Sequence, residues 1–299
     1  MATAQEMKWG ITGGGGQLAQ SLSEILTRKG IDHRSWHHSE IDITEPTSMQ
    51  LISEFQPNVL VNCAAWTNVD GAEDSFEQAL KVNCEGAKNV ALTAKELNIP
   101  LVHISTDYVF SGEGLDPWHV DDSPHPASKY GISKLLGEQK VQEIWPVKSY
   151  IVRTAWLYGP HGKNFAKTII KKLIANNNPI QVVNDQTGQP TTTLDLANQI
   201  LSMIYSNIPG GIYHATNSGQ ATWWEFAREL ALLNKADISR VVPVTSQQFK
   251  ARAIRPKNSV LDHSVWGKVG LDSMRDWRVA LEDVFPGLRN RVIGEMTSD

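Results

Sequence analysis

Tyr130 and Lys134 stand four residues apart in the segment Tyr130-Gly131-Ile132-Ser133-Lys134. On a helix this spacing places both side chains on one face, with Cβ atoms about 5–6 Å apart. A phenol has an ordinary pKa of about 10, and a neighbouring ammonium lowers that pKa because it stabilises the phenolate. The pair therefore indicates a proton donor tuned towards neutral pH. The same spacing also occurs by chance on solvated helix faces, so the surrounding sequence has to decide between the two interpretations.

The first half of the chain alternates short apolar runs with amphipathic stretches. We expect strands at Lys8–Thr12, Ile31–Trp36, Asn58–Cys63, Leu101–Ser105 and Ser149–Thr154. Helices are expected between them, at Gln17–Lys29, Pro46–Phe55, Ala72–Leu97 and Ser128–Ile144. This order predicts an α/β fold, a doubly wound parallel sheet of the Rossmann type with helices on both faces. Such sheets bind ligands at the carboxyl ends of their strands.

The pattern loosens after Gly159. Shorter elements are expected at Asn164–Ala175, Ile180–Val183, Leu194–Tyr205, Gly211–Ala215, Thr222–Leu233 and Val241–Val244, with further helices near Ser264 and Val279. We predict a dinucleotide-binding domain at residues 1–159, to which residues 192–216 return. Residues 160–191 and 217–299 are predicted to form a smaller C-terminal substrate-binding lobe.

A glycine-rich turn follows the first expected strand, in Thr12-Gly13-Gly14-Gly15-Gly16-Gln17-Leu18-Ala19. The frame places Gly13, Gly16 and Ala19 where the strand passes into the first helix. Glycine there permits a tight turn and a close approach of the backbone to a pyrophosphate, and the helix N-terminus supplies N–H donors. A plain glycine-rich turn is the alternative, but the position in a βαβ unit favours dinucleotide binding.

The choice between NADH and NADPH stays open. His37 and His38 occupy the end of the second expected strand, where an acid would bind the ribose or an arginine would bind a 2′-phosphate. Asp42 follows, in Ile41-Asp42-Ile43, and could approach the adenine ribose or cap the helix that begins near Pro46.

Composition excludes several classes of function. The 299 residues are 41% hydrophobic and 20% charged, with a net charge of −4 and no basic run, so nucleic acid and anionic membranes are not expected partners. No apolar stretch approaches the roughly 20 residues that span a bilayer. The polar Met1–Met7 lacks a signal-peptide core. Cys63 and Cys84 lack metal-ligand spacing, which favours a reduced, cytoplasmic enzyme or binding protein.

Several motifs occur in a recognisable order: Gly13-x-x-Gly16, Asn62-Cys63-Ala64-Ala65, Ser105-Thr106-Asp107-Tyr108-Val109-Phe110 and Tyr130-x-x-x-Lys134. Together they resemble the extended short-chain dehydrogenase/reductases. Four further segments resemble the dTDP-4-dehydrorhamnose reductase family within that group: residues 66–73, 153–159, 184–191 and 255–259. The resemblance spans nearly the whole chain.

The resemblance implies a role for each matching position. Thr106, Tyr130 and Lys134 would form the catalytic set. The cofactor, NADPH or NADH, would contact Gly13, Gly16, Gln17, Leu18, Asp42, Ile43, Ala64, Ala65, Tyr130 and Lys134. The dTDP-sugar substrate would contact Thr67, Val69, Thr106, Asp107, Tyr108, Trp156, Arg255 and Asn258. Asn83 matches an asparagine that supports the active-site helix in the wider family.

Three positions depart from the family pattern. Ala19 replaces a glycine, Trp66 stands where a smaller aromatic residue is usual, and His38 stands where arginine often binds a 2′-phosphate. No cluster of acidic residues suits a magnesium site, so no metal and no metal-bridged dimer are expected. The sequence leaves open whether the chain forms a homodimer.

The implied reaction is the NAD(P)H-dependent reduction of dTDP-4-dehydro-L-rhamnose, with Tyr130 as the proton donor. Thr106 would orient the ketone, and Lys134 would hold the ribose and lower the phenol's pKa. One alternative is a reductase of another nucleotide-linked 4-keto sugar. A second alternative is a non-catalytic regulatory subunit with a reductase-like fold, against which the intact Thr106, Tyr130 and Lys134 argue.

Overall fold

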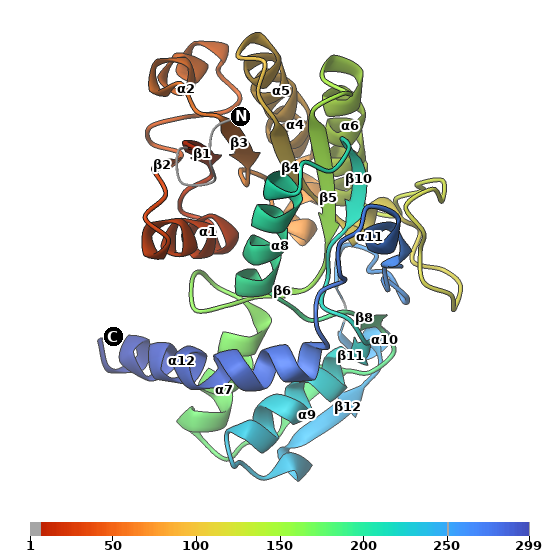
Figure 1. Cartoon of the computed structure of the whole chain (residues 1–299). Helices are drawn as coiled ribbons and strands as arrows, with labels where there is room; N and C mark the ends of the chain where they lie inside the picture. The colour runs from red at the N-terminus through yellow and green to blue at the C-terminus, as the bar shows by residue number, and fades with distance from the viewer. Residues whose placement is uncertain (1–6, 250, 299) are drawn as a thin grey trace.

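The computed structural model describes residues 7–249 and 251–298, and its larger part is built on a six-stranded sheet (Figure 1). The strands are β1 (Trp9–Thr12), β2 (His33–Trp36), β3 (Val59–Asn62), β4 (Leu101–Thr106), β5 (Ser149–Thr154) and β10 (Gly211–His214). They lie in the order β2-β1-β3-β4-β5-β10, and neighbours pair in parallel. β1, β3 and β5 are buried at every position, as expected for a parallel sheet covered on both faces.

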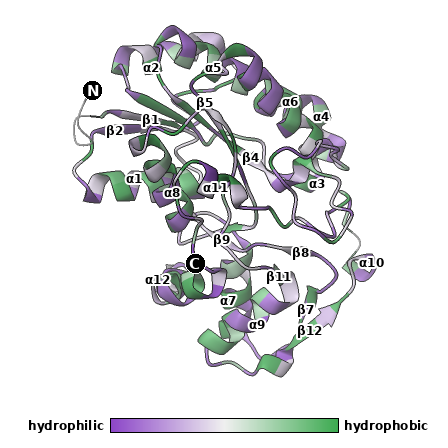
Figure 2. Cartoon of the chain, turned by 45° about the vertical axis from the view of Figure 1, so that its right-hand side comes forward, coloured by the Kyte–Doolittle hydropathy of each residue, from purple (hydrophilic) through white to green (hydrophobic). Residues whose placement is uncertain are grey.

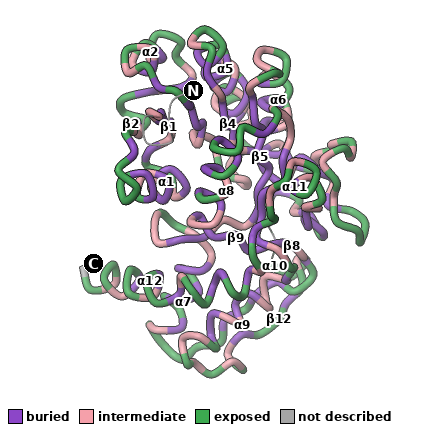
Figure 3. Tube along the Cα trace, viewed as in Figure 1, coloured by how far each residue is buried: buried purple, intermediate pink, exposed green. Residues whose placement is uncertain are grey.

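Helices cover both faces of this sheet. α1 (Gln17–Arg28), α8 (Thr193–Tyr205) and α11 (Ser264–Lys268) share one apolar cluster with the strands. η1 (Pro46–Met49), α2 (Gln50–Phe55), α5 (Ala87–Glu96) and α6 (Lys129–Ile144) share a second cluster on the opposite face. In Figure 3 the strands are mostly buried, and the outer turns of these helices are exposed. The predicted doubly wound α/β fold is confirmed.

The strand order reverses next to β1. The chain passes from β1 outwards to β2 and then returns to the other side of β1 to form β3. The carboxyl ends of β1 and β3 lie side by side, where Thr12 Oγ1 donates a hydrogen bond of 2.7 Å to Asn62 Oδ1. Connections diverge at such a point and leave a crevice, which is where doubly wound sheets bind ligands.

The prediction of a single long helix at Ala72–Leu97 is wrong. The segment contains α3 (Val69–Asp74), α4 (Phe76–Leu80), the π-helical η2 (Lys81–Gly86) and then α5. The chain leaves helical geometry at Ser75, which has φ −126°. The π-helical turn lies against α6, where a Cβ on Gly137 would come within 2.1 Å of the carbonyl oxygen of Asn83. Such turns occur often at functional sites.

The second half of the chain adds a smaller lobe below the sheet in Figure 1. Its helices are α7 (Phe165–Ala175), α9 (Trp223–Leu233), η4 (Ile238–Arg240), α10 (Ser246–Phe249) and α12 (Trp277–Ser298). Its short strands form three pairs, β6 (Leu157–Tyr158) with β9 (Thr191–Thr192), β7 (Ile180–Val183) with β12 (Val241–Val244), and β8 (Thr187–Gly188) with β11 (Ala221–Thr222). A separate apolar cluster formed by α7, α9 and α12 stabilises this lobe.

The helices of both lobes carry hydrophobic and hydrophilic residues together, as Figure 2 shows. Among residues 7–249 and 251–298, the helices lack the length and apolar character that crossing a bilayer requires. β10 joins the large sheet beside β5, so the chain returns to that sheet after entering the smaller lobe.

Candidate functional site

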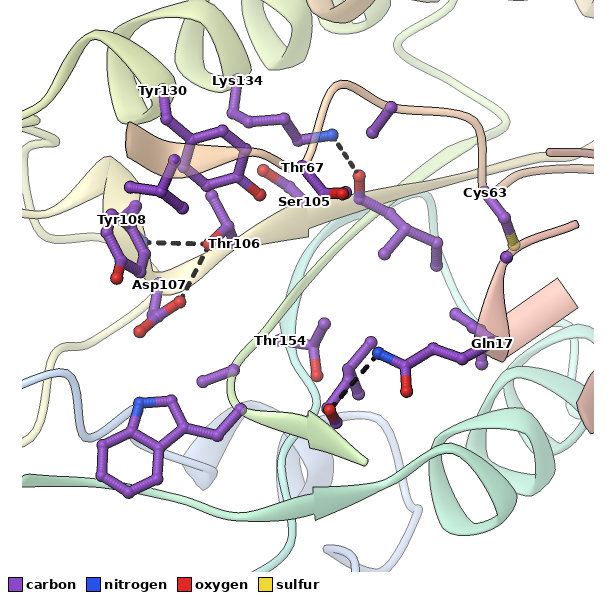
Figure 4. Close-up of a pocket in the computed structure, with 18 of the residues that line it drawn as sticks. Gln17, Cys63, Thr67, Ser105, Thr106, Asp107, Tyr108, Tyr130, Lys134 and Thr154 are labelled. Carbon is purple, nitrogen blue, oxygen red and sulfur yellow. Dashed lines mark hydrogen bonds between the residues drawn. The ribbon is translucent and has the colours of Figure 1, made fainter. Parts of the chain in front are cut away.

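A cavity of about 560 Å³ opens at the carboxyl ends of the strands, between the sheet and the smaller lobe (Figure 4). Its floor comes from the ends of β4 and β5 and from the turns that follow β1 and β3. Its lining consists of Gly15, Gly16, Gln17, Leu18, Cys63, Ala65, Thr67, Val69, Ile104, Ser105, Thr106, Asp107, Tyr108, Tyr130, Lys134, Thr154, Ala155, Trp156, Leu157, Gly162, Lys163 and Trp223.

Tyr130 and Lys134 project into this cavity from the start of α6. Ser128 caps the helix, since its hydroxyl accepts a hydrogen bond of 3.1 Å from the backbone N–H of Gly131. Lys134 Nζ donates a bond of 2.6 Å to the carbonyl oxygen of Ile104 in β4. The helix and its capping residue thus hold a phenol and an ammonium against the end of the central strand.

Thr106 ends β4 beside the phenol. Its hydroxyl donates to Asp107 Oδ1 at 2.9 Å and accepts from the backbone N–H of Tyr108 at 3.2 Å. The Tyr130 phenol points towards Thr106 in Figure 4, and its ring meets the Tyr108 ring edge to face, with centroids 5.4 Å apart. The structure therefore brings Thr106, at the end of β4, together with Tyr130 and Lys134 of α6.

The predicted lowering of the phenol's pKa is wrong in this structure. Burial raises the pKa of Tyr130, and this effect is larger than the opposing effect of the neighbouring Thr106 hydroxyl. Burial also lowers the pKa of the Lys134 ammonium to about 8, with Glu138 and Cys63 acting in the opposite direction. Desolvation penalises the charged form of each group and dominates here. At neutral pH both groups are therefore protonated, the phenol as a neutral group and Lys134 as a cation.

The glycine turn approaches the end of β3 very closely. Gly13 has φ +73°, and a Cβ there would lie 2.6 Å from the backbone nitrogen of Ala64. The first turn of α1 contains no acidic residue, and Gly16 caps it without a side-chain hydrogen bond. This N-terminus therefore presents N–H groups and a partial positive charge. The turn, the helix and the cavity fit the pyrophosphate of a dinucleotide.

Replacing Gly13 with alanine is expected to destabilise the protein by more than about 2 kcal/mol, because a left-handed conformation and a backbone clash add. Gly30→Ala is the matched control: Gly30 also has a positive φ, +67°, but no atom lies within 4 Å of its added Cβ. The Gly30→Ala variant should be destabilised only by the left-handed conformation of its alanine, by about 1–2 kcal/mol. Urea denaturation of both variants measures the difference, and equal losses would contradict the close approach of Gly13 to Ala64.

Six of the expected binding residues do not line the cavity: Gly13, Asp42, Ile43, Ala64, Arg255 and Asn258. Asp42 Oδ1 accepts a bond of 2.9 Å from the backbone N–H of Thr44, and Ile43 is buried in the apolar cluster under α5. Arg255 pairs with Asp70 at 2.8 Å. The buried Asn258 donates to the carbonyl oxygen of Asp116 at 2.9 Å, which fixes two loops together.

The wall opposite Thr106 is aromatic. Trp156 has φ +48° and stacks on Trp223, with ring centroids 3.6 Å apart and planes 9° apart. A Cβ on Gly188 would come within 2.5 Å of the Trp156 indole, so Gly188 makes room for this stack. Trp223 was not among the expected residues. The Thr222-x-x-Glu225 capping box marks the start of its helix, but nothing local in the sequence places that start opposite Trp156.

Asn83 supports the active-site helix, as the resemblance implied. From the π-helical turn, its side chain accepts from the backbone N–H of Trp66 at 2.8 Å and donates to Ser133 Oγ at 2.9 Å. Ser133 in turn donates to the carbonyl oxygen of Tyr130 at 2.7 Å. These bonds connect the loop after β3 to the first turn of α6.

A buried ion pair lies beneath the site. Glu138, one turn after Lys134, accepts hydrogen bonds from Arg153 Nε at 3.0 Å and Arg153 Nη2 at 2.8 Å. It also accepts from Ser105 Oγ at 2.5 Å. The side chains of Glu138 and Arg153 are only 1% and 2% exposed. The pair therefore joins α6 to the ends of β4 and β5 directly behind the cavity.

Comparison with known proteins places the chain in a family. The family model described as the RmlD substrate binding domain matches residues 7–290. A dTDP-4-dehydrorhamnose reductase of Streptomyces griseus is 42% identical over 95% of each chain. A dTDP-4-keto-6-deoxy-D-glucose reductase of Streptomyces niveus is 39% identical, over 93% of this chain and 96% of that protein.

A solved structure agrees with these relatives. The dTDP-4-dehydrorhamnose reductase of Bacillus anthracis, crystallised in complex with NADP, matches with a TM-score of 0.90 and 37% identity over 94% of this chain and 99% of that one. The sheet order, the glycine turn and the Thr-Tyr-Lys cavity agree with the resemblance found in the sequence. The chain is an NAD(P)H-dependent oxidoreductase and belongs to the dTDP-4-dehydrorhamnose reductase family.

Proposed function

We propose that this protein reduces the 4-keto group of dTDP-4-dehydro-L-rhamnose to give dTDP-L-rhamnose. The observation that carries the proposal is the convergence of Thr106, Tyr130 and Lys134 in one cavity beside the glycine turn. The names of the relatives support the class of substrate.

The residues of the cavity fit a bound nicotinamide dinucleotide, which supplies the hydride for the reduction. Gly13, Gly16, Gln17 and Leu18 would hold its pyrophosphate, and Ala64 and Ala65 would line its path towards the nicotinamide. Lys134 would hydrogen-bond to the nicotinamide ribose, exchanging its bond with the carbonyl oxygen of Ile104 for bonds with the ribose hydroxyls.

Tyr130 acts as the general acid in this proposal. As the ketone is reduced, negative charge develops on its oxygen, and a protonated phenol within hydrogen-bond reach neutralises it. The raised pKa keeps the phenol protonated in the resting protein. Thr106 lies beside the phenol, and its hydroxyl can rotate from Asp107 to donate to the same oxygen. The two hydroxyls together orient the ketone and stabilise its developing charge.

The pH dependence should follow Lys134. Its ammonium has a pKa lowered to about 8, so the charge is present at neutral pH and is lost as the pH rises through that value. The Tyr130 phenol stays protonated over this range. We therefore expect kcat/KM for NADPH to fall above a pH of about 8. In a Lys134→Arg variant the fall should disappear, because a guanidinium does not deprotonate; an unchanged alkaline limb would contradict the assignment to Lys134.

The sugar would lie between Thr106 and the stacked indoles of Trp156 and Trp223. Thr67, Val69, Asp107 and Tyr108 would form the rest of its wall. An aromatic face suits the apolar side of a deoxysugar, and Asp107 offers a hydrogen-bond acceptor. Arg255 and Asn258, expected at the nucleotide end of the substrate, lie outside the cavity wall, so their contribution to binding is a weaker part of this proposal.

A second 4-keto sugar is the competing substrate, since the Streptomyces niveus relative is named a dTDP-4-keto-6-deoxy-D-glucose reductase. The two substrates differ in the configuration of the hexose, which the aromatic wall would contact. Initial rates of NADPH oxidation with each dTDP-4-keto sugar decide between them. We expect the larger kcat/KM with dTDP-4-dehydro-L-rhamnose, and a preference for the other sugar would overturn this choice.

We also propose the division of the chain into two parts, with residues 1–159 and 192–216 forming the cofactor domain and residues 160–191 and 217–299 forming the substrate lobe. The separate apolar clusters on the two sides of the cavity support a division into two parts, although α11, within residues 217–299, packs in the cluster of the sheet. A cytoplasmic location and a homodimer stay predictions from the sequence.

A further inference from the structure

A loop of the smaller lobe, residues 159–164 between β6 and α7, forms the cavity wall that faces the glycine turn. Gly162 and Lys163 line the cavity together with Gly15, Gly16 and Gln17. A Cβ on Gly162 would lie 3.6 Å from Gln17 Cβ, so the loop packs against the first residue of α1. The glycine turn therefore has a second wall, and that wall carries a lysine.

Side-chain contacts fasten this loop to α1. Gln17 Nε2 donates a bond of 3.3 Å to the carbonyl oxygen of Leu157, and Asn164 Nδ2 donates a bond of 3.5 Å to Gln17 Oε1. His161 Nε2 lies 2.9 Å from Glu24 Oε1, two turns further along the helix. The position of Lys163 relative to the helix N-terminus is thus set by contacts on both sides of it.

The carbonyl oxygens of residues 159–162 are already occupied within the loop. Asn164 Nδ2 donates to the carbonyl oxygens of Gly159 and His161 at 2.9 and 3.4 Å. Lys167 Nζ donates to the carbonyl oxygens of Pro160 and Gly162 at 3.3 and 3.0 Å. Glu295 lies 2.6 Å from the Lys167 ammonium and balances its charge. These acceptors are therefore satisfied and do not compete for the Lys163 ammonium.

Lys163 is the cation at this end of the cavity. Across residues 7–249 and 251–298, no carboxylate forms an ion pair with its exposed side chain. The other lysine of the cavity, Lys134, lies under the end of β4 and donates to the carbonyl oxygen of Ile104. The glycine turn and the first turn of α1 contribute N–H groups and no acid. An anion held between the two walls would meet positive charge from both.

We propose that Lys163 binds the pyrophosphate of the nicotinamide dinucleotide, from the side opposite the glycine turn. The inference rests on the proposed placement of the cofactor and adds the smaller lobe to its binding site. An ammonium-to-phosphate hydrogen bond is charge-assisted and stronger than a neutral one. Because the loop belongs to the substrate lobe, this contact would also link cofactor binding to the position of that lobe.

The test measures binding without any sugar substrate. Dissociation constants for NADPH and NADH are obtained from nicotinamide fluorescence, and that for dTDP by calorimetry, at low and high salt. The variants are Lys163→Gln and Lys163→Arg, with Lys172→Gln on the exposed surface of α7 as the matched control. Thermal unfolding establishes that each variant is folded; exposed Lys163 should be replaceable without loss of stability.

Lys163→Gln is expected to weaken NADPH and NADH equally, by about tenfold at low salt and less at high salt. Lys163→Arg and Lys172→Gln should bind both as the unaltered protein does, and dTDP affinity should not change. Unchanged NADPH affinity would overturn the proposal. A loss confined to NADPH would assign Lys163 to the 2′-phosphate, and a loss confined to dTDP would assign it to the substrate; both overturn it. If the unaltered protein binds neither NADPH nor NADH, the proposed function fails as well. If the unaltered protein reduces the keto sugar and the Lys163→Gln variant binds NADPH with unchanged affinity, only this inference is rejected.

Discussion

Replacing Tyr130 with phenylalanine is expected to lower kcat for ketone reduction by about 10²–10⁴-fold. The change removes one hydroxyl from a buried ring, and the ring itself keeps its edge-to-face contact with Tyr108. Without the phenol the developing alkoxide loses its proposed proton donor, and Thr106 alone can only donate a hydrogen bond. Initial rates with NADPH and the dTDP-4-keto sugar measure the effect.

The dissociation constant for NADPH should change little in the same variant, because the proposed contacts with the ribose come from Lys134. Tyr150→Phe is the matched control: its hydroxyl donates to the carbonyl oxygen of Ile208 at 2.9 Å, and Tyr150 does not line the cavity. That variant should retain full activity. A Tyr130→Phe variant with the turnover of the unaltered protein would reject Tyr130 as the general acid.

Replacing Glu138 with glutamine is expected to destabilise the protein by about 3–5 kcal/mol, because it leaves the buried Arg153 guanidinium without its counter-ion. The amide keeps the size of the carboxylate and a hydrogen-bonding oxygen for Ser105 Oγ. The loss of stability therefore measures the effect of removing the negative charge. Arg153 also lies over the Phe110 ring, 5.0 Å from its centroid, and this contact does not replace a carboxylate. Urea denaturation with a folded baseline gives the free energy of unfolding.

The same helix supplies the control. Glu143 pairs with Lys140 at 2.8 Å on the exposed face of α6, where solvent screens the interaction. Glu143→Gln should leave stability unchanged within error. A double variant, Glu138→Leu with Arg153→Leu, should recover much of the loss, since it leaves no unpaired charge. Equal stability of Glu138→Gln and Glu143→Gln would show that the buried pair does not contribute as its geometry indicates.

The sequence was sufficient for the main sheet because parallel strands buried on both faces read as continuous apolar runs. Asn58–Cys63 and Leu101–Ser105 were expected as strands, and the structure has Val59–Asn62 and Leu101–Thr106. The glycine turn and the Tyr130–Lys134 pair were also visible, since both depend on local spacing. The break at Ser75 and the π-helical turn were not, because the packing of Gly137 against Asn83 joins residues far apart in the chain.

The cavity's far wall could not be predicted for the same reason. Trp223 and Lys163 belong to segments that look like ordinary helix starts and loops, and only the tertiary structure places them opposite Thr106 and the glycine turn. Electrostatics were also misjudged from the sequence. The spacing of Tyr130 and Lys134 indicated a lowered phenol pKa, but spacing carries no information on burial, which reverses the direction.

The transfer of a labelled hydride tests the central claim most directly. NADPH carrying deuterium at the transferable position of its nicotinamide is incubated with the protein and dTDP-4-dehydro-L-rhamnose, and the product is examined by NMR and mass spectrometry. The proposed function predicts dTDP-L-rhamnose with deuterium at the 4-position of the sugar, formed in the same amount as the NADPH consumed. An unlabelled product, or no consumption of NADPH with this sugar, would contradict it.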